Sequence, residues 1–118
     1  MAAIPTETAA TSASQTKLGA TTLTDVYTMS RHGAVEIHSI VFCNQGGATT
    51  YRLAIAYKGV ADDASQYLAY DTAIAANAMV LIEFARGKRL SLGDVIRAYA
   101  GSADLSVNIE GAVAGVVT

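Results

Sequence analysis

The residues in this sequence that could carry out chemistry are few and widely spaced. His32 precedes a glycine, and His38 lies six residues further on, on the polar side of a stretch that alternates apolar and polar residues. A nucleophilic triad needs a serine or cysteine beside a histidine and a carboxylate, and no Gly-x-Ser-x-Gly motif accompanies these histidines. We therefore expect a protein that is not an enzyme.

Residues suited to binding metals or phosphates are equally scarce. Cys43 is the single cysteine, so neither an internal disulfide nor a cysteine-based zinc site can form. Asp62 and Asp63, followed by Ser65, could hold Ca²⁺ with help from backbone carbonyls, although an acidic solvated turn explains the same residues. No glycine-rich loop leads into a helix, as phosphate binding would require. We expect no cofactor and no metal.

Charged side chains nonetheless mark candidate contacts with other proteins. The densest basic group is Arg86, Lys88 and Arg89, which fits either a solvated hairpin tip or a contact between subunits. Asp62 and Asp63 are its candidate acidic partners. Three cations without an interleaved aromatic residue, in a chain of net charge −2, are a weak signal for nucleic acid. We expect contacts with proteins and no direct contact with nucleic acid.

The elements that must position these residues are strands, because apolar residues recur with a period of two. In residues 51–58 the aromatic and large apolar side chains, Tyr57 included, face one side, and Arg52, Ala54, Ala56 and Lys58 face the other. Small alanine side chains allow close approach of a partner. The face that runs from Arg52 to Lys58 is therefore a candidate docking surface, and a second one is formed by Ala98 and Ala100.

Turn signals separate such segments at intervals of roughly 8–12 residues, the spacing of all-β sandwiches and barrels. The predicted strands are residues 17–19, 23–29, 34–43, 51–58, 66–74, 79–85, 89–92, 95–100 and a last segment around 105–110. The fold class predicted is all-β: a single antiparallel β-sandwich of about eight strands, either jelly-roll or immunoglobulin-like. The spacing alone does not distinguish these two topologies.

The first sixteen residues differ from the rest in composition. They are mostly Ala, Thr and Ser, with one charged residue, Glu7, and no aromatic residue. Such a segment cannot offset a backbone ordering cost of about 1–2 kcal/mol per residue. We predict an extended arm over residues 1–16, either a frayed end or a docking arm that contacts a partner through Ile4, Pro5 and Thr6. The β-sandwich domain is predicted over residues 17–118.

The overall composition excludes several classes of protein. Apolar residues make up 52% of the chain and charged residues only 15%, which argues against a disordered charged tail. The longest strongly apolar run, residues 72–82, is about half the length of a membrane-spanning helix, and the N-terminus lacks the features of a secretory signal. We expect a soluble protein made in a reducing compartment, with no membrane contact.

The sequence contains the stretches VEIHSIVFCN (35–44), TYRLAI (50–55), YLAYD (67–71) leading to IAAN (74–77), LGDVIRAYA (92–100) and ADLSVNIEG (103–111). Together these stretches resemble small β-sandwich virion proteins of tailed bacteriophages. These motifs are structural, so the resemblance carries over no active-site residue. It implies a capsid decoration (cement) protein on the capsid surface of a virion that is assembled in the host cytoplasm.

The resemblance also implies partners. They are the major capsid protein or other virion proteins, together with further copies of this chain in a dimer or trimer. Two alternatives remain open: a tail, adaptor or fibre component of the virion, and a carbohydrate-binding β-sandwich module. A sugar site would place aromatic side chains on one exposed face. We instead expect Tyr51 and Tyr57 in the core, and Tyr67, Tyr70 and Tyr99 in the core or a subunit interface.

Overall fold

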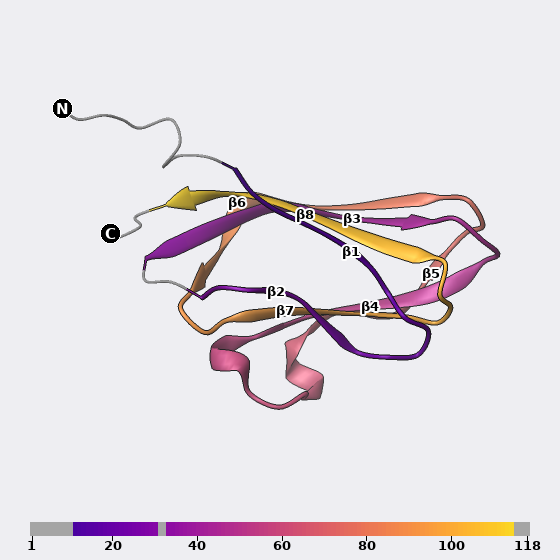
Figure 1. Ribbon diagram of the computed structural model, residues 1–118, viewed down its shortest axis with the longest axis horizontal. Helices are drawn as coiled ribbons and strands as arrows, with labels where there is room; N and C mark the ends of the chain where they lie inside the picture. Colours follow the sequence, from indigo (N-terminus) through magenta and orange to yellow (C-terminus); the bar gives the residue numbers. More distant parts are fainter. Residues whose placement is uncertain (1–10, 31–32, 115–118) are drawn as a thin grey trace.

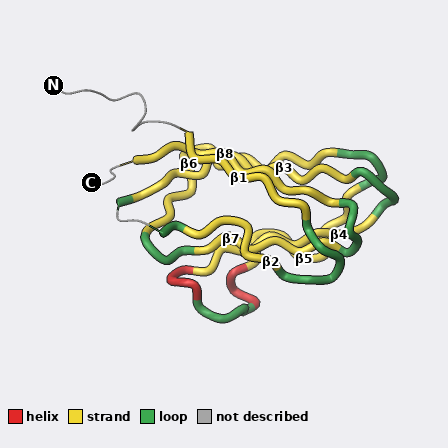
Figure 2. The backbone as a smooth tube through the Cα atoms, viewed as in Figure 1, coloured by secondary structure: helices red, strands yellow, loops and turns green. Residues whose placement is uncertain are grey.

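Strands make up most of the described part of the chain. The computed structural model describes residues 11–30 and 33–114 (Figures 1 and 2). In that part the strands are β1 (Thr11–Lys17), β2 (Thr24–Thr28), β3 (Ala34–Asn44), β4 (Thr49–Ala56), β5 (Tyr67–Ile74), β6 (Met79–Ser91), β7 (Val95–Ala100) and β8 (Leu105–Ala114). Two short 3₁₀ turns, η1 (Tyr57–Gly59) and η2 (Ala64–Gln66), lie between β4 and β5. No helix among these residues is long and apolar enough to cross a membrane.

The strands form two antiparallel sheets that pack face to face. Sheet A has the order β1-β8-β3-β6 and sheet B the order β2-β7-β4-β5. The pairs are nested: β4 with β5, β3 with β6, β2 with β7, and β1 with β8. One antiparallel ribbon with the β4–β5 hairpin at its tip, wrapped into two layers, gives this order, which is a jelly roll. The predicted antiparallel β-sandwich is confirmed, and the nested pairing selects the jelly roll.

The core lies between the two sheets. The rings of Phe42, from sheet A, and Tyr51, from sheet B, have centroids 4.5 Å apart. Each large side chain that is fully buried stabilises the fold by about 1.5–3 kcal/mol. The largest of them are Phe42, Leu18, Met29, Ile37, Ile40, Leu53, Ile74, Leu90, Ile96, Leu105 and Ile109. Burial of these side chains is the main reason that the two sheets stay together.

The predicted boundary of an N-terminal arm at residue 16 is wrong. Thr11–Lys17 forms β1, which pairs with β8 from Thr11↔Ala112 to Lys17↔Ser106. Backbone pairing with β8 orders this segment, although its sequence is mostly Thr and Ser. The rest of the predicted arm, residues 1–10 with Ile4, Pro5 and Thr6, lies outside the described residues, as does His32.

The hairpin tip predicted around Arg86 and Lys88 is also wrong. β6 continues through this segment from Met79 to Ser91. Gly87 has a φ of 74°, and the register between β6 and β3 shifts here, between Ile37 and Ser39. A glycine inside a strand marks a bulge as readily as a turn, and here it marks a bulge.

The alanines of the two predicted docking faces are buried inside the molecule and are not available to a partner. Ala54 and Ala56 are fully buried, because residues 57–66, which we call the η loop, fold over the outer face of sheet B. In Figure 1 this loop lies below β4 and β7, on the side away from sheet A. Ala98 and Ala100 are buried in the core. The small side chains therefore allow close packing within the molecule.

The strand predicted over residues 51–58 ends two residues early, which changes the place of Tyr57. β4 stops at Ala56, and Lys58 adopts a left-handed φ of 59° inside η1. Tyr57 is consequently exposed instead of lying in the core.

Candidate functional site

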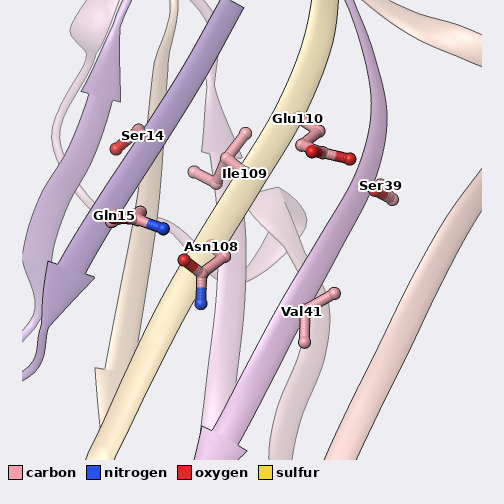
Figure 3. Close-up of a pocket in the computed structure, with 7 residues that line it drawn as sticks. All are labelled: Ser14, Gln15, Ser39, Val41, Asn108, Ile109 and Glu110. Carbon is pink, nitrogen blue, oxygen red and sulfur yellow. The ribbon is translucent and has the colours of Figure 1, made fainter.

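Polar side chains gather in three surface hollows of the described part of the chain. The first, of about 700 Å³, lies on the outer face of sheet A across β1, β8 and β3. Figure 3 shows Gln15, Asn108 and Val41 on these neighbouring strands, and they are paired as Gln15↔Asn108 and Val41↔Asn108. Glu110 and Ser39 pair in the next row. This surface offers amide, hydroxyl and carboxylate groups for hydrogen bonds with a partner.

The second hollow lies at the bulge between β3 and β6. It is lined by Glu36, His38, Glu83 and Arg86, among others. Nη2 of Arg89 lies 3.3 Å from Oε2 of Glu36, and Nε2 of His38 lies 4.0 Å from Oε1 of the same carboxylate. His38 and Arg89 are exposed and Glu36 is partly exposed. Ion pairs at such a surface contribute about 0–1 kcal/mol. The hollow is best described as a solvated charged surface.

The three cations predicted as one basic group have different contacts in the structure. Arg89 pairs with Glu36, whereas Nζ of Lys88 lies 5.7 Å from the ring centroid of Tyr57. Arg86 lines the second hollow. Among the described residues, no ion pair joins any of these three cations to Asp62 or Asp63.

The third hollow lies on the outer face of sheet B, where the η loop meets β5. Its volume is about 590 Å³, and Arg52, Asp62, Asp63, Ala64, Tyr67 and Tyr70 line it. Three of the residues predicted as interaction sites, Arg52, Asp62 and Asp63, thus share one site. The fourth in this region, Lys58, lies apart: its Nζ donates to the backbone oxygen of Leu92 at 3.1 Å.

Arg52 is the centre of this site. Its Nε and Nη2 donate to the two carboxylate oxygens of Asp71 at 2.6 and 3.3 Å. Its Cζ lies 4.1 Å from the ring centroid of Tyr70 and 4.2 Å from that of Tyr99, so the guanidinium is held between two aromatic rings. The hydrogen bonds that Arg52 donates to Asp71 raise the pKa of Arg52 further, and the cation is permanent. Cation–π contacts of this kind are worth about 0.5–1 kcal/mol each at exposed positions.

A bulge in β5 brings these side chains to one side of the sheet. Between the pairs Tyr51↔Thr72 and Leu53↔Ala69, the two residues Tyr70 and Asp71 stand opposite Arg52 alone. Neighbours in a regular strand would point to opposite faces. Asp71 reaches the same face as Tyr70 by adopting a left-handed φ of 47°, which is unusual for a residue other than glycine.

A second register shift adds Tyr67 to the cluster. It falls between the pairs Leu53↔Ala69 and Ala54↔Tyr67, so Leu68 has no opposite residue in β4. Tyr67 and Tyr70, three residues apart, consequently meet edge to face with centroids 4.9 Å apart. Burial, followed by the neighbouring Asp62 carboxylate, raises the pKa of Tyr67. Tyr70 is exposed, so it does not lie in the core, and its place in a subunit interface stays a prediction.

In the acidic pair of the η loop, Asp63 has a structural role. Oδ2 of Asp63 accepts hydrogen bonds from the backbone N–H and the hydroxyl of Ser65, at 3.0 and 2.5 Å, and so caps η2. These bonds lower the pKa of Asp63. Among the described residues no three His, Cys, Asp or Glu side chains are grouped closely enough to hold a metal ion.

Sequence reasoning found Arg52, Asp62 and Asp63 but missed what surrounds them. Asp71, Tyr67, Tyr70 and Tyr99 join the site through the bulges of β5 and through the pairing of Arg52 with Tyr99 across β4 and β7. The signal in the sequence was two tyrosines three residues apart, followed by an aspartate. These side chains share one face of the sheet only because the pairing of β5 with β4 is shifted at two points. Comparison of this chain with family models, curated proteins and solved structures finds no match in any of the three.

Proposed function

We propose that this chain is a non-enzymatic structural protein of a bacteriophage virion. Its role is that of a capsid decoration protein, which binds the major capsid protein and neighbouring copies of itself and thereby stabilises the shell. The sequence resemblance suggests this role, and a small jelly roll with low charge suits a module packed among other proteins. The alternative within the virion is a tail, adaptor or fibre component.

The observation that supports assembly most directly is the apolar first half of β6. Met79 and Leu81 point outward and are 64% and 49% exposed. Val41 pairs with Leu81 and continues the apolar surface onto β3. Val80, Ile82 and Phe84, on the other side of the strand, pack against the core but remain only partly buried. Apolar residues on both sides of one strand are unusual at a surface that faces water.

The position of β6 in the sheet strengthens this argument. β6 is the outermost strand of sheet A, so one edge of its backbone pairs with no strand in the described part of the chain. A long apolar edge strand readily adds a further strand or sheet from another molecule. Interfaces between copies of one chain are also the most apolar class. The β6 edge is accordingly assigned to the contact between copies.

Sedimentation equilibrium and co-sedimentation with capsids test the proposal. The purified chain should form a closed dimer or trimer and should sediment with capsids of the phage that encodes it. Leu81→Lys should shift the oligomer to the monomer by at least tenfold in dissociation constant. Val60→Lys is the matched control, because Val60 is similarly exposed but lies on the η loop.

Two outcomes would overturn this assignment. A monomer at all concentrations that also fails to sediment with capsids would remove the structural role. Binding to isolated tails instead of capsids would mean that the chain is a tail, adaptor or fibre component and not a decoration protein.

A further inference from the structure

We propose that the outer face of sheet B carries a binding site for neutral carbohydrate, formed by Tyr67, Tyr70 and the carboxylate of Asp62 beside Arg52. The site is the hollow of about 590 Å³ between the η loop and β5. It lies on sheet B, whereas the β6 edge belongs to sheet A, so it does not depend on the assembly proposed above.

The first support is that strand β5 is irregular at the point where the site lies. β5 has two register shifts within eight residues, and Asp71 is left-handed. A non-glycine residue in that region costs of order 1 kcal/mol or more, and such distortions concentrate at binding sites. Their joint effect is to collect two tyrosines and a carboxylate around one arginine. A regular strand would have turned Tyr67 and Tyr70 to opposite faces.

The second support is the exposed aromatic surface. Tyr70 remains 56% exposed although Arg52 lies over its ring and Tyr67 meets it edge to face. The face of a tyrosine ring is electron-rich, and it attracts the weakly positive C–H groups of a pyranose ring. An open, shallow hollow with a ring at its side suits a sugar unit better than a fully enclosed small molecule.

The charges of the site select the class of ligand. Arg52 is held by both oxygens of Asp71, so its charge is balanced within the protein. Asp62 and Asp63 then leave the lining with excess negative charge, which disfavours phosphate, sulfated or sialylated ligands. A carboxylate accepts short, strong hydrogen bonds from neighbouring hydroxyl groups. A neutral hexose presents such hydroxyls beside a C–H face, and this combination matches the lining.

The third support is that the site is held in place before any ligand binds. Nη1 of Arg97 donates to the backbone oxygen of Val60 at 2.8 Å, and its Nε donates to Asp25 at 2.9 Å. Within the loop, Nε2 of Gln66 donates to the backbone oxygen of Ala61 at 2.9 Å, and Asp63 caps η2. A loop fixed at both ends holds Asp62 in place, which lowers the entropy cost of binding.

A glycan array tests this inference on the full chain. The array carries neutral, sialylated and sulfated oligosaccharides, and polylysine spots serve as a cationic probe. Retention on neutral glycans is expected. Nuclear magnetic resonance titration with the retained oligosaccharide should shift the backbone signals of the η loop and β5. Tyr70→Ala and Asp62→Asn should each weaken binding at least tenfold.

Matched variants separate the site from general effects on the surface. Tyr57→Ala removes a tyrosine that is 54% exposed outside the hollow, and Asp104→Asn changes an exposed carboxylate on another loop. Both should bind like the unchanged chain. Thermal unfolding of each variant should show that the fold is retained.

The inference fails if no neutral glycan is retained, or if Tyr70→Ala and Asp62→Asn, both folded, bind as well as the unchanged chain. Retention on polylysine alone would assign the hollow to a cationic protein segment instead. Neither result bears on the oligomer or on capsid binding, so failure here is distinguishable from failure of the proposed structural role.

Discussion

Asp94 accepts a hydrogen bond from the backbone N–H of Lys58, across 36 residues of sequence, at 2.9 Å. Its other carboxylate oxygen accepts from the N–H of Ser91 at 2.8 Å, and the side chain is buried. One carboxylate therefore joins the β6–β7 turn to the start of the η loop. Lys58 is left-handed at this point, and the bond helps to hold it so.

Replacement of Asp94 should destabilise the protein. Asp94→Ala leaves the part-buried N–H groups of Lys58 and Ser91 without their acceptor, which should lower the free energy of unfolding by about 1–3 kcal/mol. Asp94→Asn should cost less, because one amide oxygen can still accept. Urea unfolding followed by circular dichroism measures both values. Asp104→Ala, at an exposed position, is the control, and equal stability of the two alanine variants would contradict the prediction.

Gly111 should tolerate no side chain. A Cβ added there would overlap the backbone oxygen of Glu36 in the neighbouring strand β3, closer than real Cβ atoms approach such an atom. Gly111→Ala should therefore destabilise the central β3–β8 pairing by about 2 kcal/mol or more. Gly47→Ala is the matched control, because nothing lies within 4 Å of its added Cβ. Thermal unfolding should separate the two variants, and similar melting temperatures would show that β3 and β8 can move apart at this point.

The sequence predicts the strands where burial follows a period of two. The β3 segment around Val35 and Ile37, and the β8 segment around Val107 and Ile109, have one buried and one wetter face. Their starts at Ala34 and Leu105 were predicted closely, although β8 continues to Ala114, beyond its predicted end. Their patterns are local, so no knowledge of partners is needed.

What the sequence could not predict depends on pairing between distant strands. β1 is ordered by β8, about a hundred residues later, and its own composition gives no sign of this. Gly87 looks like a turn because the bulge that it allows exists only opposite β3. The cluster of Tyr67, Tyr70 and Asp71 likewise needs the register shift against β4. In each case the local sequence pattern fits two structures, and the pairing with the neighbouring strand determines which of them forms.

Tyr67 should give the protein a distinct alkaline response. Its pKa is raised in the folded state by burial and then by Asp62. A group whose folded pKa lies above the unfolded value contributes stability at pH values below the unfolded pKa, about 10 for tyrosine. That contribution is lost as the pH rises through the folded pKa, because the unfolded chain then binds fewer protons than the folded one.

The measurement is the free energy of unfolding as a function of pH, for the unchanged chain and for Tyr67→Phe. The unchanged chain should lose stability more steeply above pH 10 than the variant does. Absorbance titration of tyrosinate should also lose a component that titrates above pH 10 in Tyr67→Phe. Identical slopes for the two proteins would mean that the Tyr67 hydroxyl is as solvated in the fold as in the unfolded chain.

Two truncations distinguish the strand β1 from the residues that precede it. A chain that starts at Thr11 keeps every pair between β1 and β8, whereas one that starts at Leu18 loses all of them and bares the edge of β8. At about 0.5–1.5 kcal/mol for each net hydrogen bond, the shorter chain should be less stable by at least about 3 kcal/mol, and the longer one should match the full chain. Urea unfolding measures both.

The same pair of truncations tests the docking role proposed for Ile4, Pro5 and Thr6. Because the chain from Thr11 retains the whole sandwich, any loss in its co-sedimentation with capsids reports on residues 1–10 alone. We expect at least a tenfold weaker attachment at unchanged thermal stability. Full occupancy of the capsid by this truncated chain would remove the first ten residues from the interface and leave attachment to the surface of the sandwich. Unfolding of the same chain would instead show that residues 1–10 contribute to the stability of the fold.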